Sequence, residues 1–248
     1  MIRPFTVVLA LFLTACVSTP ANKVDNVKMA EGYYMKGVSY LQKKNYELAV
    51  VEFQRSIQTD KKNKNAYFAL GSVSETMNKL ADAERYYEAA IDIDPNFAEA
   101  HNARGVVYSR QERWQDALKA FNKALENKLY TTPHVAYYNM AHVYMAQKNY
   151  DKAIEAYRDS KRFANYDQTI YELGTALFEA GKVKESISEF REGVSLSPSN
   201  AYIRYGLALA LLKDGNKKAA LAEFKKTVEL APQSEVAKKA KDYITTLR

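Results

Sequence analysis

A residue pattern that returns six times constrains the fold of this 248-residue chain more than any other feature. A small residue marks each copy, a second small residue follows twelve positions later, and an aromatic ring follows four positions after that. Successive marks lie 34, 34, 36, 33 and 34 residues apart. The marks are Gly37, Gly71, Gly105, Ala141, Gly174 and Ala208; the second small residues are Ala49, Ala83, Ala117, Ala153, Ser186 and Ala220; the rings are Phe53, Tyr87, Phe121, Tyr157, Phe190 and Phe224. A fixed period of this length is the signature of stacked structural repeats.

The small residues indicate close packing between helices. Glycine inside a helix costs roughly 0.5–1 kcal/mol relative to alanine, so four glycines at one position indicate a packing need that outweighs helix propensity. We expect the two small residues where paired helices touch, because a side chain larger than alanine's would push the helices apart. We expect each ring to fill the space between one pair and the next, since a single pair cannot bury its apolar face alone.

Together with Pro95, Pro198 and Pro232, which close three of the copies, these positions resemble the tetratricopeptide repeat, a helix-turn-helix unit of 34 residues. The resemblance implies an all-α fold, a right-handed α-solenoid, and a protein that binds other proteins. It divides the chain into six repeats over residues 30–63, 64–97, 98–133, 134–166, 167–200 and 201–234. Ser234 is of the residue type that N-caps helices, and residues 235–248 are expected to form a helix that caps the last repeat.

The N-terminal residues resemble a bacterial lipoprotein signal. Arg3 precedes an apolar run over residues 5–13 that is too short to span a bilayer. Leu13, Thr14, Ala15 and Cys16 then resemble a lipobox, which implies removal of residues 1–15 and attachment of lipid to the Cys16 sulfur. The alternative is an ordinary signal peptide with a chance cysteine. Cys16 is the chain's one cysteine, which excludes an internal disulfide and a cysteine zinc site.

The residues after Cys16 concern location. The sorting rule that accompanies the lipobox assigns a lipoprotein to the inner membrane when aspartate follows the lipidated cysteine. In this chain Val17 follows Cys16. The resemblance therefore implies the periplasmic face of the outer membrane. Residues 17–29 look like a flexible tether, which would reach roughly 40–45 Å at about 3.3–3.6 Å per extended residue.

The charge balance excludes one class of partner and leaves another open. The chain has 36 basic and 29 acidic residues, a net charge of +7. Its last 36 residues hold nine basic and five acidic side chains, a net +4. One interpretation is a basic surface that binds acidic lipids or an acidic protein partner. The other is that these residues simply form solvated helix faces. Nucleic acid is not expected, because cations alternate with acids along each helix and the chain is predicted to be exported.

The sequence lacks the residue patterns of catalytic and metal sites. His101, His134 and His142 match no metal-ligand spacing. His101 falls in a packing position, His134 at a join between repeats, and His142 on the inner face of its helix. There is no nucleophile elbow, no glycine-rich phosphate loop and no carboxylate pair. We therefore expect no enzymatic activity, no cofactor and no metal.

The first helices of the repeats are expected to line a concave groove, where this family usually binds its ligand. Three residues before each mark, five of six residues are aromatic, and rings with a polar tip are common interface anchors. The alternative is that the curvature of the stack buries these rings. The predicted protein-binding groove consists of Tyr34, Val38, Leu41, Phe68, Ser72, Asn102, Val106, Tyr138, His142, Tyr171 and Tyr205.

The residue types in this predicted groove indicate what kind of ligand it binds. Repeats that grip a C-terminal carboxylate use Lys, Arg and Asn in these rows, whereas Asn102 is the one polar member of the aromatic row here. We therefore expect the ligand to be an apolar segment, either an amphipathic helix or an added strand.

The spacing of the repeats is irregular at one place. The longest gap between marks, 36 residues, places two extra residues around positions 129–133, which form either a hinge or a tolerated insertion.

A lipobox followed by six such repeats in about 250 residues is similar to the type IV pilus pilotin lipoproteins of the PilF, PilW and Tgl type. Residues 124–130, Pro133 and residues 138–141 resemble the middle of those proteins. The resemblance implies a lipoprotein that binds subunits of the secretin, the pilus pore, and assists their localisation or assembly. It also suggests Tyr34, Val38, Leu41 and Phe68 as contacts. The alternatives are a scaffold for peptidoglycan-modifying enzymes and an accessory of a lipid or polysaccharide export complex.

Overall fold

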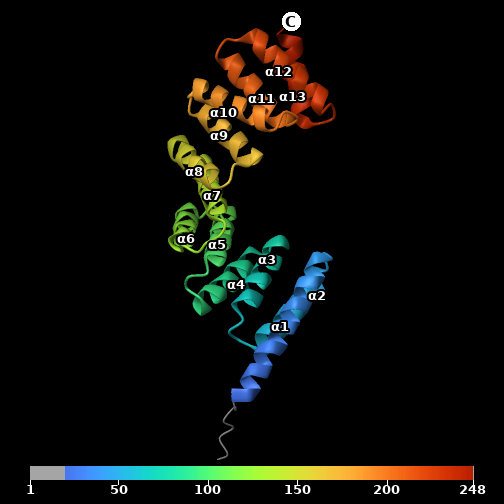
Figure 1. The fold of residues 1–248 in the computed structure, drawn as a ribbon, viewed down its shortest axis with the longest axis vertical. Coiled ribbons are helices and arrows are strands. Elements are labelled where there is room, and N and C mark those ends of the chain that lie inside the picture. The colour runs from blue at the N-terminus through green and yellow to red at the C-terminus, as the bar shows by residue number, and fades with distance from the viewer. Residues whose placement is uncertain (1–19, 248) are drawn as a thin grey trace, which may run out of the picture. The chain divides into compact units, whose positions relative to one another are not determined.

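The computed structural model describes residues 20–247, and this range consists of helices joined by short loops, with no strand (Figure 1). Six helix pairs precede a single last helix. The first helices of the pairs are α1 (Pro20–Gln42), α3 (Lys64–Thr76), α5 (Ala98–Arg110), α7 (Pro133–Ala146), α9 (Asp167–Glu179) and α11 (Ala201–Lys213). Their partners are α2 (Tyr46–Thr59), α4 (Leu80–Ile93), α6 (Trp114–Glu126), α8 (Tyr150–Phe163), α10 (Val183–Leu196) and α12 (Lys217–Leu230), and α13 (Glu235–Thr246) follows. The predicted all-α class of helix-turn-helix repeats is confirmed.

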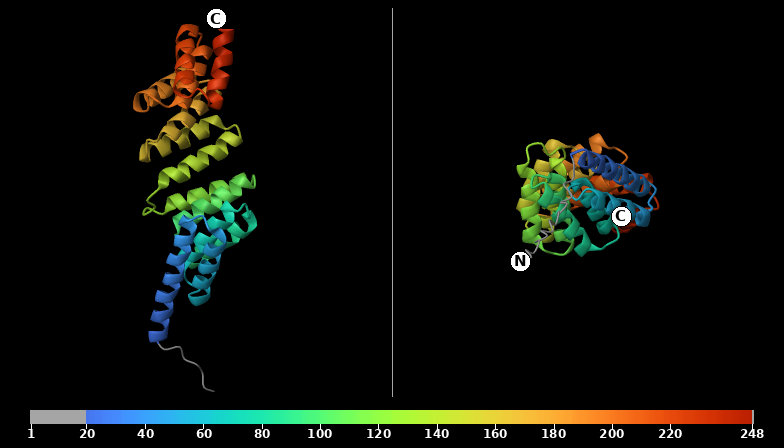
Figure 2. Two further views of the ribbon diagram at one scale, coloured as in Figure 1. Left: turned by 90° about the vertical axis from the view of Figure 1, so that its right-hand side faces the viewer. Right: turned by 90° about the horizontal axis from the view of Figure 1, so that it is seen from below.

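The chain divides into two compact units, Met1–Leu70 and Gly71–Arg248. In the first unit α1 packs along α2. In the second unit each pair contacts the next in chain order, as α6 does with α7, α8 with α9 and α10 with α11 (Figure 2). Neighbouring pairs of this unit therefore share apolar surface, as stacked repeats require.

The predicted tether needs a correction. Helix α1 begins at Pro20, so ten of the residues assigned to the tether, 20–29, are helical. Proline suits a first helical turn because its missing N–H would have no partner there. A helical residue advances about 1.5 Å rather than about 3.3–3.6 Å, so this segment reaches less than half as far as predicted. Residues 17–19 and Cys16 lie outside the described residues.

A tight turn of one type joins the two helices in every pair. Its middle residue has a left-handed backbone, with φ between 56° and 85°, at Lys44, Asn78, Glu112, Lys148, Gly181 and Gly215. The next amide donates to a carbonyl five residues earlier, as Arg113 does to Tyr108 at 2.9 Å. This bond caps the exposed carbonyls at the helix end and reverses the chain within three residues.

The packing around the repeat marks differs in one respect from our expectation. A Cβ on Gly37 would lie 2.5 Å from Cε1 of Phe53, in the partner helix of the same pair, and Gly71, Gly105 and Gly174 face Tyr87, Phe121 and Phe190 in the same way. The ring therefore fills the space beside the glycine, and even an alanine methyl would overlap with it. The ring also reaches the next pair, because a Cβ on Gly206 would lie 2.5 Å from Phe190.

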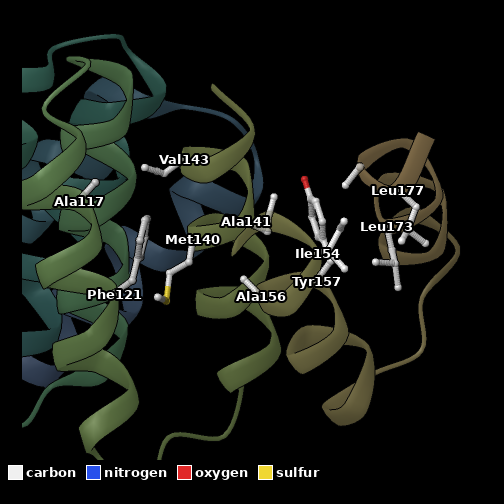
Figure 3. Close-up of a cluster of buried hydrophobic side chains, with 12 residues drawn as sticks. Ala117, Phe121, Met140, Ala141, Val143, Ile154, Ala156, Tyr157, Leu173 and Leu177 are labelled. Atoms are coloured by element: carbon white, nitrogen blue, oxygen red, sulfur yellow. The ribbon is translucent and has the colours of Figure 1, made fainter. Parts of the chain in front are cut away.

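A continuous core links the third, fourth and fifth pairs (Figure 3). Phe121 of α6, Met140 and Val143 of α7, Tyr157 of α8 and Leu173 of α9 belong to this one cluster of buried side chains. Burial of each such side chain contributes roughly 1.5–3 kcal/mol. The core therefore crosses two boundaries between repeats, and no repeat in this part of the chain has a core of its own.

The long join between the third and fourth pairs is packed. Tyr130 is buried against Ala98, Ala124 and Ala136. Asn127 donates from Nδ2 to the Asn96 carbonyl at 2.7 Å. The inserted residues around positions 129–133 are thus held by one buried ring at their centre, although Leu129 is 86% exposed.

The last helix covers the end of the stack. Ser234 caps α13, accepting a hydrogen bond from the Ala237 amide at 3.2 Å. Val236 and Ala240 are buried, and the Tyr243 ring stacks on Phe224 with centroids 4.8 Å apart. Helix α13 therefore shields the core ring of the sixth pair, as the capping prediction requires.

Candidate protein-binding surface

The predicted row of rings is partly exposed in each described repeat. Every member of the row three residues before the marks is half-buried: Tyr34, Phe68, Asn102, Tyr138, Tyr171 and Tyr205. The neighbouring positions Val38, Leu41, Ser72 and Val106 are also half-buried, and His142 is exposed. Burial of the row by the curvature of the stack is therefore not what the structure shows.

The rings of this row, which we call the aromatic row, rest on the buried core rings of their own repeats. Centroids lie 5.8 Å apart for Tyr34 and Phe53, 5.7 Å for Tyr138 and Tyr157, and 5.8 Å for Tyr205 and Phe224. Aromatic pairs at this distance are mutually attractive. A ring already held in this way loses little conformational freedom when a ligand covers its free side.

The hydroxyl groups of the aromatic row are neutral hydrogen-bonding groups. Burial raises the pKa of the Tyr138, Tyr171 and Tyr205 hydroxyls above their ordinary value. They therefore remain protonated near neutral pH. Each can donate one hydrogen bond at the edge of an otherwise apolar contact.

The fourth and fifth repeats add a histidine and a carboxylate to this surface. The His142 ring lies 4.5 Å from that of Tyr138 and 5.7 Å from that of Tyr157, and desolvation lowers the His142 pKa although part of the side chain is exposed. Gln168 donates to Glu172 at 2.8 Å, and burial raises the pKa of that carboxyl. We did not predict Glu172, although its place beside Tyr171 in the sequence signals it.

The one polar member of the row already has a partner. Asn139 of α7 donates from Nδ2 to Oδ1 of Asn102 in α5, at 3.1 Å. This hydrogen bond joins two consecutive first helices. Asn102 therefore contributes to the packing of repeats as well as to the surface, and Asn139 is a second surface residue that the row prediction missed.

The other two histidines do not belong to this surface. His101 is buried, and its Nε2 lies 2.9 Å from the Pro95 carbonyl oxygen, as a packing role predicts. The His134 ring is half-buried and lies 5.5 Å from Tyr166 at the edge of the fourth repeat. Among residues 20–247 no group of His, Cys, Asp or Glu side chains has the arrangement of a metal site. None of the helices in this range combines the length and the hydrophobicity of a membrane span.

Family models agree with the helix pairs. Models described as tetratricopeptide repeat match residues 30–63, 68–130, 134–160 and 171–235. The chain belongs to the tetratricopeptide-repeat family. Members of this family are typically scaffolds that bind other proteins.

Several curated proteins are similar to this tetratricopeptide-repeat chain in sequence. An uncharacterized protein of Haemophilus influenzae is 26% identical over 166 residues, which cover 65% of this chain and 93% of that protein. The type IV pilus assembly protein PilF of Pseudomonas aeruginosa is 28% identical over 179 residues, 69% of this chain and 70% of PilF. Protein bimA of Emericella nidulans is 34% identical over 131 residues, but these cover only 15% of bimA.

Solved structures share the repeat fold. The structure of Pseudomonas aeruginosa PilF has a TM-score of 0.75 at 20% identity and covers 88% of this chain and 99% of its own. PilW, a type IV pilus biogenesis factor, also has a TM-score of 0.75 at 20% identity, with 85% and 97% covered. YrrB, a tetratricopeptide-repeat protein with an unusual peptide-binding site, has a TM-score of 0.62 at 22% identity. At these identities the likeness is one of fold.

Proposed function

We propose that this protein is a type IV pilus biogenesis factor that binds a protein partner through the aromatic row and assists the secretin in localisation or assembly. One observation carries the proposal. The similarity to PilF extends over 69% of this chain and 70% of PilF, at 28% identity. A shared repeat motif alone would cover only a small share of a longer protein, as the match to bimA covers 15% of that protein.

The aromatic row suits an apolar segment of the partner. Its half-buried rings stand on the first helices of five of the six repeats, and small or apolar residues such as Val38 and Ser72 lie near them. An amphipathic helix or an added strand could place one apolar side chain against each ring. Rigid rings are efficient anchors because they bury a large area for few rotatable bonds.

We also propose that lipid on Cys16 holds the protein at the periplasmic face of the outer membrane. Each buried CH₂ group of an acyl chain contributes about 0.8 kcal/mol, so several chains give firm attachment. The repeats would then face the periplasm, where secretin subunits pass on their way to the membrane.

To test this, the gene is deleted in the host and the deletion strain is complemented with the Tyr138→Ala/Tyr171→Ala variant. Secretin multimers in the membrane fraction are then measured. We expect the deletion to deplete multimers and twitching motility, and the row variant to restore them poorly. The matched control is Phe163→Ala/Tyr166→Ala, which removes two exposed rings outside the row. Normal multimers in the deletion strain would refute the proposal, and a defect in cell shape or division would indicate a cell-wall scaffold instead.

A further inference from the structure

A cleft distinct from the aromatic row lies between the third and fourth repeats. It has a volume of about 940 Å³ and is walled by α5, α6, α7 and α8, all within the second unit. Tyr108 and Tyr144 contribute two aromatic rings to it, Leu118 an aliphatic side chain, and Arg104, Lys119 and Lys152 positive charge.

The geometry of the first helices separates this cleft from the aromatic row. An α-helix turns about 100° per residue, so Arg104 and Tyr108 lie roughly 200–240° around α5 from Asn102. Tyr144 lies about 240° around α7 from Tyr138 by the same rule. The cleft therefore opens on the opposite side of these two helices, and a ligand there would not compete for the row.

The charges of the cleft are unbalanced. Its lining includes four cations and two acids, and both acids already have partners: Asp116 pairs with Arg113 at 3.0 Å, and Glu126 pairs with Lys123 at 2.6 Å. In the part of the chain that the structure describes, no carboxylate pairs with the remaining cations, which are Arg104, Lys119 and Lys152. The cleft is thus complementary to negative charge.

Arg104 shares its position in the repeat with one other cation, Lys36, which is exposed and pairs with Glu52 at 2.9 Å. The equivalent residues of the next three repeats are Met140, Leu173 and Leu207, which are all buried in apolar cores. Arg104 is half-buried, its guanidinium lies 5.7 Å from the Tyr108 ring centroid, and its buried Nε has no hydrogen-bond acceptor. A buried donor without a partner is destabilising, so packing alone would favour an apolar side chain here.

We propose that this cleft binds an acidic segment of a protein partner. Carboxylates of that segment would accept hydrogen bonds from Arg104, Lys119 and Lys152, and an apolar side chain between them would contact Leu118 and the Tyr144 ring. A nucleic acid fits less well, because its evenly spaced phosphates would also meet Asp116 and Glu126 on the same walls. This second surface goes beyond the proposed role in pilus biogenesis.

The test measures fluorescence anisotropy of a labelled peptide of about twelve residues, rich in Glu and Asp with interspersed Leu, titrated with the purified chain. Lys119→Glu/Lys152→Glu reverses two exposed charges of the cleft. Lys217→Glu/Lys225→Glu makes the same net change at two exposed sites in α12. We expect the cleft variant to weaken binding at least about tenfold and the control to weaken it less than about threefold.

Arg104→Met separates binding from folding. Methionine stands at the equivalent position 140, so this variant should keep or raise the melting temperature while it weakens peptide binding about tenfold. Equal losses in the cleft and control variants, or a loss in neither, would overturn the proposal. A competition assay gives a further check. If oligothymidine displaces the labelled peptide at a lower concentration than an unlabelled acidic peptide does, the cleft is a nucleic-acid site and the proposal is overturned.

Discussion

At the scale of single residues, the aromatic ring beside each repeat glycine explains why that position is small. Gly37 and Gly32 both belong to α1, but only Gly37 has a ring against it. A Cβ on Gly32 would meet nothing within 4 Å, whereas one on Gly37 would meet the buried Phe53. A glycine-to-alanine substitution should therefore change the free energy of unfolding in opposite directions at these two positions, which are five residues apart.

We expect Gly37→Ala to lower the free energy of unfolding by about 1–3 kcal/mol, because the Phe53 ring must leave its packed position. Gly32→Ala should raise it by about 0.5–1 kcal/mol, because alanine is the better helix former. Urea unfolding followed by circular dichroism measures both. Two changes of the same sign would show that the ring does not decide the residue at position 37.

At the scale of the elements, the left-handed residue in each turn sets how closely two paired helices can follow each other. Two repeats place glycine there, but Glu112 adopts a φ of 59° despite its side chain. A left-handed backbone costs a side-chain-bearing residue about 1–2 kcal/mol. The turn between α5 and α6 therefore forms against a local conformational preference.

Glu112→Gly should stabilise the protein by about 0.5–1 kcal/mol, since relief of that strain exceeds the extra flexibility glycine gives the unfolded chain. The control is Lys119→Gly at an exposed site inside α6, where glycine should cost about 1 kcal/mol. Thermal unfolding of the two variants beside the parent chain compares them directly. A destabilised Glu112→Gly variant would mean that the Glu112 side chain makes a contact worth more than the strain.

At the scale of the whole molecule, the proposed lipid anchor predicts where the protein is found. Cys16→Ser removes the sulfur that would carry the lipid. We expect the variant to move from the membrane fraction to the soluble periplasmic fraction, and its mass to lack the acyl chains. Fractionation followed by mass spectrometry measures both. Membrane retention of the serine variant would contradict anchoring through Cys16.

Most of the repeat fold could be predicted because its signals are local and periodic. The period near 34 places a mark in every first helix, and the 3.6-residue helical turn then assigns Tyr138 and His142 to one face. The start of α1 was missed, because residues 20–29 lack both an apolar stripe and a repeat mark. Residues 24–29 are exposed in the helix, so no packed face marks this segment in the sequence.

The sequence by itself determined the helix pairs, their order and the residues of the aromatic row, since backbone periodicity alone assigns these. The tertiary structure decided which side chains meet: Phe53 against Gly37, Asn139 with Asn102, and Arg104 at the edge of a cleft rather than in a core. The first two contacts join residues 16 and 37 positions apart, and the cleft brings together residues as far apart as Arg104 and Lys152. The exposure of a side chain and the residues it contacts depend on how helices pack in three dimensions. A local sequence pattern does not specify which distant residues come together.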